Sequence, residues 1–279
     1  MEYVGLFYNP RVPESLPLAR EIITWLAERS VETWLCSTHE QPSEQVCLPE
    51  TELIITLGGD GTILRSMPLV APLGIPVLGL NLGRVGFLTE CVPENWPNVV
   101  RRILAGEGEI EERLMLQATH LRGEEIVSQD FALNDVVLSR GGSARTVHLE
   151  AHIDGAPLTT YVADGLILAT ATGSTAYSYA VGGPILPPWI HNFLLVPVAA
   201  HLSLERPLVL NADAKVEVIA RTRYPGILTV DGRMENRLCD GDRVRVHRCP
   251  LQARFLRLRS RGDFYRTLVK RLTPRNNGE

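Results

Sequence analysis

Leu53 to Thr62 reads LIITLGGDGT, and this stretch decides the fold of the N-terminal part of the chain. Its first five residues form a short apolar run, which is typical of a strand buried on both faces. The run stops at Gly58-Gly59, and a helix is expected immediately afterwards, over 62–69. Glycines let the backbone approach a ligand closely, and the first N–H groups of a helix attract anions. The turn therefore predicts a phosphate site between a strand and a helix.

The neighbouring segments continue this alternation of strands and helices. Further strands are expected over 3–8, 31–36 and 75–80, and a helical spacing of apolar residues predicts a helix over 16–27. Apolar strands alternating with helices favour a parallel sheet covered on both faces. We therefore expect an N-terminal Rossmann-like α/β domain over 1–106.

The pattern changes after residue 107, where short strand-like runs are joined by Gly, Asn and Asp turns. One helix is expected near 174–181. The expected strands cover 114–121, 131–139, 146–153, 161–169, 194–198, 216–220, 227–230 and 244–247. This texture predicts a predominantly antiparallel β domain over 107–256, followed by a C-terminal segment over 257–279.

The composition excludes several classes of protein. The 279 residues are 45% hydrophobic and 22% charged with a net charge of −4, which argues against a disordered chain and against a general nucleic-acid surface. The arginine-rich stretch 243–275 is interpreted as solvated or paired arginines. Five cysteines without CxxC spacing argue against a zinc site or a disulfide framework.

Residues 165–204 contain no Lys, Arg, Asp or Glu. A membrane helix does not explain this segment, because four prolines interrupt it and its longest apolar run, 193–200, is far shorter than the roughly 20 residues that cross a bilayer. The chain also begins without the basic and apolar regions of a signal peptide. We expect a cytoplasmic protein in which these uncharged residues line a ligand site.

Asp60 is the unusual member of the glycine turn. A carboxylate beside phosphates is repulsive unless it binds a metal or takes a proton, and both are useful in phosphoryl transfer. A plain Asp-Gly turn is the alternative. The chain has no Gly-Lys pair, which excludes a Walker A loop, and Leu64 stands where the dinucleotide fingerprint needs glycine. Phosphate charge would then be met by backbone amides, Mg²⁺ or arginines such as Arg65 or Arg84.

Three other motifs carry polar groups or glycines near expected turns. In 81–88 (NLGRVGFL), Phe87 could pack on a base or ribose or belong to the core. Asn134 and Asp135 could bind a base edge and ribose hydroxyls, or mark the end of a strand. The hydroxyls of 172–178 (TGSTAYS), downstream of Asp164, suit neutral recognition of a nucleotide, or they cap a helix. His148 and His152 are interpreted as structural.

These motifs, in this order, resemble those of bacterial-type NAD kinases. The segments that carry the resemblance are LGGDGTILR, NLGRVGFLTE, LNDVVLSR, DGLILATATGSTAYSYAVGGPIL and VDGR, spread over residues 53–233. GGDGT alone is less specific, since lipid kinases and phosphofructokinases carry similar loops. The resemblance implies transfer of the γ-phosphoryl group of ATP, or of polyphosphate, to the 2′-hydroxyl of the adenosine ribose of NAD, with Asp60 accepting the proton.

The resemblance also implies the binding residues. Those for NAD and ATP would be Gly58, Gly59, Asp60, Gly61, Thr62, Arg65, Phe87, Asn134, Asp135, Arg145, Asp164, Thr175, Ala176, Tyr177, Ser178, Tyr179, Ala180, Ala199 and Arg233. A divalent ion, Mg²⁺ or Mn²⁺, would be held through the ATP phosphates, with Asp60 as the candidate direct ligand. The family further implies a homodimer or homotetramer and a C-terminal segment that returns to the first domain.

Three residues depart from the family pattern. Asp135 stands where Glu is usual, Ala171 replaces a usual proline, and Arg233 stands where Gln is usual. An extra cation at Arg233 would favour the additional phosphate of NADP or NADPH. Two alternative functions are a lipid kinase of the diacylglycerol or sphingosine type, which needs a greasy acceptor cleft, and a sensor that binds NAD(P) without catalysis.

Overall fold

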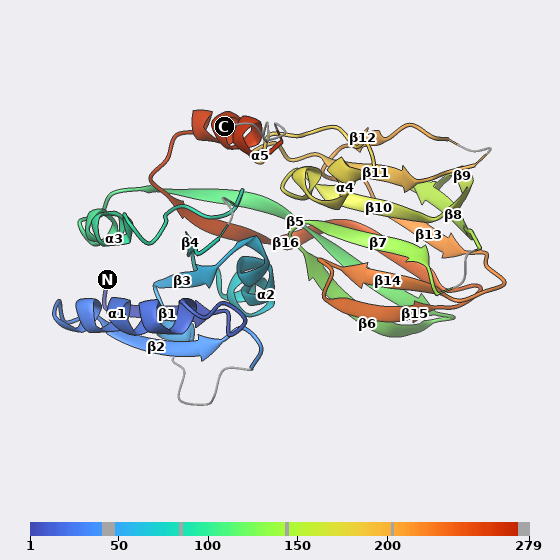
Figure 1. Cartoon of the computed structure of the whole chain (residues 1–279). Coiled ribbons are helices and arrows are strands. Elements are labelled where there is room, and N and C mark those ends of the chain that lie inside the picture. The colour runs from blue at the N-terminus through green and yellow to red at the C-terminus, as the bar shows by residue number, and fades with distance from the viewer. Residues whose placement is uncertain (41–47, 84–85, 143–144, 202–203, 273–279) are drawn as a thin grey trace. The chain divides into compact units, whose positions relative to one another are not determined.

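The structure is a computed structural model that describes residues 1–40, 48–83, 86–142, 145–201 and 204–272. The chain forms two compact units (Figure 1). Unit 1 comprises Met1–Glu112 and Ala253–Glu279, and unit 2 comprises Arg113–Gln252. The strands β5 (Glu109–Arg122) and β16 (Arg243–Arg257) contribute residues to both units. The boundaries expected after residues 106 and 256 fall just before β5 and near the end of β16.

Unit 1 contains the parallel sheet that the sequence predicts. Its strands are β1 (Tyr3–Tyr8), β2 (Glu32–Ser37), β3 (Leu53–Gly58) and β4 (Val77–Asn81), in the order β2-β1-β3-β4, and the end of β16 pairs with β4. All pairs in this series are parallel. The helices are α1 (Ser15–Ala27), α2 (Asp60–Val70), α3 (Trp96–Leu104) and α5 (Gly262–Leu272).

Helices cover both faces of this sheet. Leu78 and Leu80 of β4 lie in one cluster with buried residues of α1 and α3. Gly79 points the other way, and its missing side chain leaves room for Ile63 of α2, whose Cδ1 would lie 2.7 Å from an added Cβ. Alternate residues of a strand point to opposite faces, so α2 packs on the face opposite α1 and α3. Burial on both faces explains why every residue of β3 is buried.

Unit 2 is the antiparallel domain. One sheet pairs β16, β13 (Val216–Ala220), β8 (Val147–Ile153) and β9 (Ala156–Ala163), with β5 and β6 (Glu125–Ala132) attached. The other has the order β12-β11-β10-β7-β14-β15, formed by Leu208–Leu210, Phe193–Val198, Gly165–Thr170, Asp135–Arg140, Gly226–Val230 and Met234–Leu238. Side chains of both sheets, including Tyr161 and Phe193, form one core.

Burial on both faces explains most of the apolar part of the uncharged segment 165–204. Leu166 and Leu168 of β10 belong to the core shared by the two sheets. Ile167 and Ala169 point to the opposite face, where they form a second cluster with Leu186 and residues of β11. A charged side chain in β10 would have no solvated face to occupy, and burying an unpaired charge is costly.

Three expected elements are wrong in detail. The strand expected over 131–139 is broken at Leu133-Asn134, where the backbone N–H groups bond the side chain of Asp231. The strand expected over 161–169 is broken at Asp164, because β9 and β10 belong to different sheets. The helix expected near 174–181 is a 3₁₀ turn, Gly173–Thr175, and one helical turn, α4 (Tyr177–Ala180).

Candidate functional site

Asp60 is the first residue of α2 and follows β3 and the glycine turn. Two backbone amides hold its carboxylate: Phe87 N–H donates to Oδ2 at 2.9 Å and Leu88 N–H donates to Oδ1 at 3.1 Å. Gly86 lets this loop approach, since a Cβ there would lie 2.0 Å from Oδ1. About a quarter of the Asp60 side chain, 26%, remains exposed. The carboxylate is therefore fixed in direction while still reachable.

The glycine turn around Asp60 divides into packed and open positions. A side chain at Gly58 would lie 2.1 Å from Oγ1 of Thr62, and that hydroxyl accepts the N–H of Gly59 at 3.3 Å. In contrast, a Cβ added to Gly59 or Gly61 would meet no described atom within 4 Å. The turn thus presents bare backbone and open space beside the carboxylate, as a phosphate cradle requires.

The cation beside Asp60 is one that the sequence did not suggest. Arg65 contacts the ring of His39, and Arg84 lies outside the described residues. Instead, Nη1 of Arg271 on α5 lies 3.5 Å from Oδ2 of Asp60. Its guanidinium also stacks over the ring of Phe87, 4.9 Å from the centroid. Asp60 and Arg271 are 211 residues apart, so sequence spacing offered no signal for this pair.

The loop that holds Asp60 also anchors the C-terminal return. Glu90 has a side chain only 2% exposed, and its Oε1 accepts the N–H groups of Leu258 and Arg259 at 2.9 Å each. Its other oxygen lies 3.2 Å from Nη1 of Arg257. Phe87 is half-buried against Phe264 of α5, with ring centroids 6.1 Å apart. These are the contacts by which the C-terminal segment packs on unit 1.

In unit 2, the Asn134-Asp135 motif lies at the break between β6 and β7. The side chain of Asp231 is fully buried and accepts three backbone N–H groups, from Leu133, Asn134 and Asp135, at 2.7–3.0 Å. Burial raises the pKa of Asp135 to about 7, and the charge of Asp231 acts in the same direction. Burial also raises the pKa of Asp231, although the three amides and the charge of Arg233 act in the opposite direction.

Arg233 is directed into the protein. Its Nη2 donates to the carbonyl oxygen of Phe131 at 3.1 Å and lies 3.6 Å from Oδ2 of Asp231, and its side chain is 19% exposed. The guanidinium therefore offsets the buried Asp231 charge. Arg233 therefore has a carboxylate partner within the protein, Asp231.

The hydroxyl-rich loop packs directly on Asn134. Gly173 has no room for a side chain, because a Cβ would lie 2.1 Å from the carbonyl oxygen of Asn134. The hydroxyl of Ser174 donates to Ala171 O, and that of Thr175 donates to Thr172 O. These two hydroxyls hold the loop in shape and are engaged within the protein.

Other residues of the loop are open to a ligand. Tyr177 and Tyr179 are 45% and 40% exposed, Ala180 is exposed and Ala176 is half-buried. The buried Oγ of Ser178 has no hydrogen-bond partner among the described residues.

Asp164 and Ala199 lie together at the end of the β10–β11 pair. Asp164 N–H donates to Val198 O at 2.9 Å, and its carboxylate, 41% exposed, lies 3.0 Å from Nε of Arg140. Ala199 is exposed and has a left-handed backbone, with φ of 47°. Two predicted residues that are 35 positions apart, one inside the uncharged segment and one at its border, therefore meet at one end of this strand pair.

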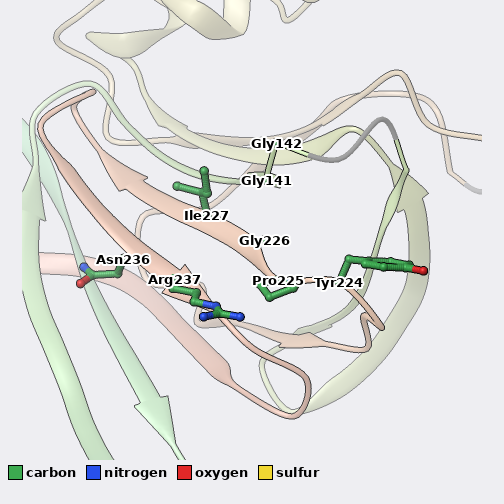
Figure 2. Close-up of a pocket in the computed structure, with 8 residues that line it drawn as sticks. All are labelled: Gly141, Gly142, Tyr224, Pro225, Gly226, Ile227, Asn236 and Arg237. Atoms are coloured by element: carbon green, nitrogen blue, oxygen red, sulfur yellow. The ribbon is translucent and has the colours of Figure 1, made fainter.

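Arg145 is exposed and lies over the ring of Tyr224, 4.6 Å from its centroid. It lines a hollow of 290 Å³ together with His148, Arg221 and Arg223. A neighbouring hollow of 470 Å³ is lined by none of the predicted residues; Figure 2 shows Tyr224, Pro225, Asn236 and Arg237 along its wall. The sequence carries no signal for this second hollow, because its walls combine loop residues with residues of β14 and β15 that no motif connects.

In the free protein, the carboxylate of Asp60 already has three partners that a directly bound divalent ion would have to share. Both oxygens of Asp60 already accept amide N–H groups, and the Arg271 guanidinium lies beside them. Within the described ranges, no three His, Cys, Asp or Glu side chains converge in a metal-binding arrangement. No described helix is long and apolar enough to span a membrane.

Comparison with known proteins identifies relatives over the whole chain. Residues 37–108 match the family model of the ATP-NAD kinase N-terminal domain, and residues 133–258 match that of the C-terminal domain. An NAD kinase of Chloroflexus aurantiacus is 43% identical over 98% of this chain and 99% of its own length. One from Dehalococcoides mccartyi is 39% identical over 98% and 96%.

Two solved structures share the fold. The yeast NADH kinase in complex with NADH has a TM-score of 0.86 at 26% identity, covering 100% of this chain and 89% of that one. An NAD kinase from Archaeoglobus fulgidus in complex with ATP has a TM-score of 0.77 at 27% identity, covering 95% and 99%. Both family relationship and fold therefore point to one class of enzyme.

Proposed function

The chain belongs to the NAD kinase family and is a phosphotransferase, and from that premise we propose how its residues carry the reaction. The γ-phosphoryl group of ATP is transferred to the 2′-hydroxyl of the adenosine ribose of NAD, which gives NADP and ADP. The bond between the hydroxyl oxygen and phosphorus forms as the bond to ADP breaks. Asp60 takes the hydroxyl proton.

The fixed but reachable carboxylate of Asp60 carries this proposal. A general base must point at the proton it removes, and the amides of Phe87 and Leu88 set that direction. Phosphoryl transfer otherwise needs positioning and neutralisation of charge more than covalent chemistry. The bare backbone of Gly59 and Gly61 supports phosphate binding at the same turn.

The acceptor dinucleotide is assigned to residues of unit 2. Asn134 and Asp135 would bind ribose hydroxyls, and the loop from Thr175 to Ala180 would cover the nucleotide with exposed tyrosines and small residues. Asp164 and Ala199 would contact it at the edge of the sheet. Arg145 is exposed, as a residue that contacts a ligand phosphate must be. Arg233 would act on the nucleotide indirectly, through Asp231 and the motif that it holds.

Mg²⁺ or Mn²⁺ is assigned to the substrate complex. The ion would arrive with the phosphates of ATP and supply neutralisation of their charge. The protein would contribute the amides of the turn and Asp60 as proton acceptor. We further propose that the protein acts in the cytoplasm as a homodimer or homotetramer, which light scattering after gel filtration would measure.

The direct test is an assay of the purified chain with ATP, Mg²⁺ and either NAD or NADH. The product is detected with a dehydrogenase that accepts only NADP or NADPH. We expect product that depends on the chain, on donor and on acceptor. A polyphosphate arm identifies the donor class, and a diacylglycerol arm tests the lipid kinase alternative. Binding of NAD without product would contradict the proposal and favour a sensor.

A further inference from the structure

We propose that Arg271 binds the terminal phosphate of the donor, and that its ion pair with Asp60 is exchanged for that phosphate when ATP arrives. This inference rests on the proposed function and adds a residue to the same site. In the free protein, Nη1 of Arg271 lies 3.5 Å from Oδ2 of Asp60. The side chain of Arg271 is 35% exposed, so an incoming anion can reach it.

The pair is easily exchanged. Ion pairs between partly exposed side chains contribute little to stability, because water screens the charges. A triphosphate carries more charge than one carboxylate and offers several oxygens to the planar guanidinium, which binds phosphate in a bidentate manner. The space over Gly59 and Gly61, in which a Cβ meets no described atom, lies beside this pair.

Arg271 is held in place by the loop that also holds Asp60. Its guanidinium stacks on Phe87, whose own N–H binds Asp60, and α5 packs on the same ring through Phe264. Upstream, Glu90 fixes the entry to α5 through the amides of Leu258 and Arg259. The loop that contains Phe87 therefore brings the proton acceptor and the cation together from two other elements, so a phosphate that draws Arg271 away from Asp60 remains next to Asp60.

The exchange gives each group one role in the transfer. With Arg271 on the phosphate, the carboxylate of Asp60 is free to take the proton of the attacking hydroxyl. The guanidinium meanwhile offsets the negative charge that stays on the phosphoryl oxygens and on the leaving ADP. The pair in the free protein would also keep the carboxylate from other partners until the donor is bound.

The experiment compares Arg271→Gln and Arg271→Lys with Arg266→Gln. Arg266 is the matched control, because it lies on the same helix, is 78% exposed and pairs with Asp263. We expect Arg271→Gln to lower kcat/KM for ATP by about 10- to 100-fold, the range for a charge-assisted hydrogen bond. KM for NAD should stay within about twofold, and Arg271→Lys should recover part of the loss, since a Lys keeps the charge but not the planar fork.

A binding arm separates this inference from the proposed function. Affinities for ATP and ADP are measured by calorimetry without acceptor, so turnover is not needed. Arg271→Gln should weaken ATP more than ADP, while Arg266→Gln changes neither. Equal losses for the two nucleotides, wild-type kinetics, or a gain in activity would each overturn the inference. Absence of product from the wild type would overturn the proposed function, while the ATP-to-ADP comparison would still decide the role of Arg271.

Discussion

The backbone N–H of Phe87 donates to Oδ2 of Asp60 at 2.9 Å, although the two residues are 27 positions apart. The strands β3 and β4 run side by side in parallel, so the loops that follow their carboxyl ends meet at one edge of the sheet. One loop supplies the carboxylate and the other supplies the amides that aim it. The geometry of the proposed proton acceptor is thus a consequence of sheet topology.

Replacing Asp60 by Asn should remove the proton acceptor and keep the fold. The Asn side chain has nearly the same shape and retains an oxygen that can accept one of the two amide N–H groups. We expect kcat to fall by at least about 100-fold, the low end for a positioned general base. Circular dichroism and steady-state kinetics provide the measurement. Turnover at the wild-type rate would rule out Asp60 as the base.

Replacing Gly86 by Ala should displace the Asp60 carboxylate, because the new Cβ would lie 2.0 Å from Oδ1 and 2.8 Å from the carboxyl carbon. We expect a loss of activity of about 100-fold or more, since a shift of about 1 Å at a reacting group can cost that much. Gly83→Ala is the matched control on the same loop, as a Cβ there meets no described atom within 4 Å. Equal kinetics for the two variants would contradict the proposed coupling between loop and carboxylate.

Replacing Glu90 by Gln should destabilise unit 1 near the C-terminal return. The buried carboxylate balances Arg257 and accepts two amides, and removing one partner of a buried ion pair costs about 3–5 kcal/mol. Urea unfolding measures the loss of free energy of unfolding. Glu107→Gln is a useful control, because its ion pair with Arg102 is 49% and 43% exposed and should contribute little. Similar losses of free energy of unfolding for both variants would contradict the stabilising role of Glu90.

Replacing Asp135 by Asn should change how stability depends on pH. The native state raises the pKa of Asp135 from 3.8 to about 7, chiefly through burial, so the folded chain keeps a proton that the unfolded chain releases. The free energy of unfolding should therefore fall as the pH rises from about 4 to about 7, by at most about 1.4 kcal/mol for each pH unit. The Asn variant lacks this contribution to the pH dependence, because Asn does not titrate.

Urea unfolding between pH 4 and pH 8 tests this expectation. The stability gained by Asp135→Asn over the wild type should grow as the pH rises towards 7 and then level off. Parallel curves for wild type and variant would show that Asp135 keeps an ordinary pKa in the fold.

The sequence predicted the parallel sheet of unit 1 because local apolar runs such as 53–57 coincide with buried strands. The antiparallel character of unit 2 was likewise predicted from short runs and turns. The breaks at Asn134 and Asp164 were missed for a physical reason. The first depends on the distant carboxylate of Asp231, and the second depends on which sheet each strand joins. Neither fact is contained in the local pattern.

The same distinction applies to the candidate site. The motif that contains Asp60 can be recognised in the sequence, because three of its five residues are glycines. Arg271 is one of many arginines in the 243–275 stretch, and its neighbours in sequence say nothing about Asp60. Only the return of the chain to unit 1 distinguishes it from Arg266, which points to Asp263 on its own helix.

The two parts of unit 1 flank unit 2, Arg113–Gln252, in the sequence. Unit 1 can therefore be completed only late in translation. Residues 253–272 emerge only after the 140 residues of unit 2 have been translated, which takes about 7–28 seconds at about 5–20 residues per second. Until then Glu90 is without Leu258 and Arg259, and Asp60 is without Arg271. A nascent chain therefore carries the glycine turn long before it carries the complete site, so a product of premature termination would lack part of the machinery.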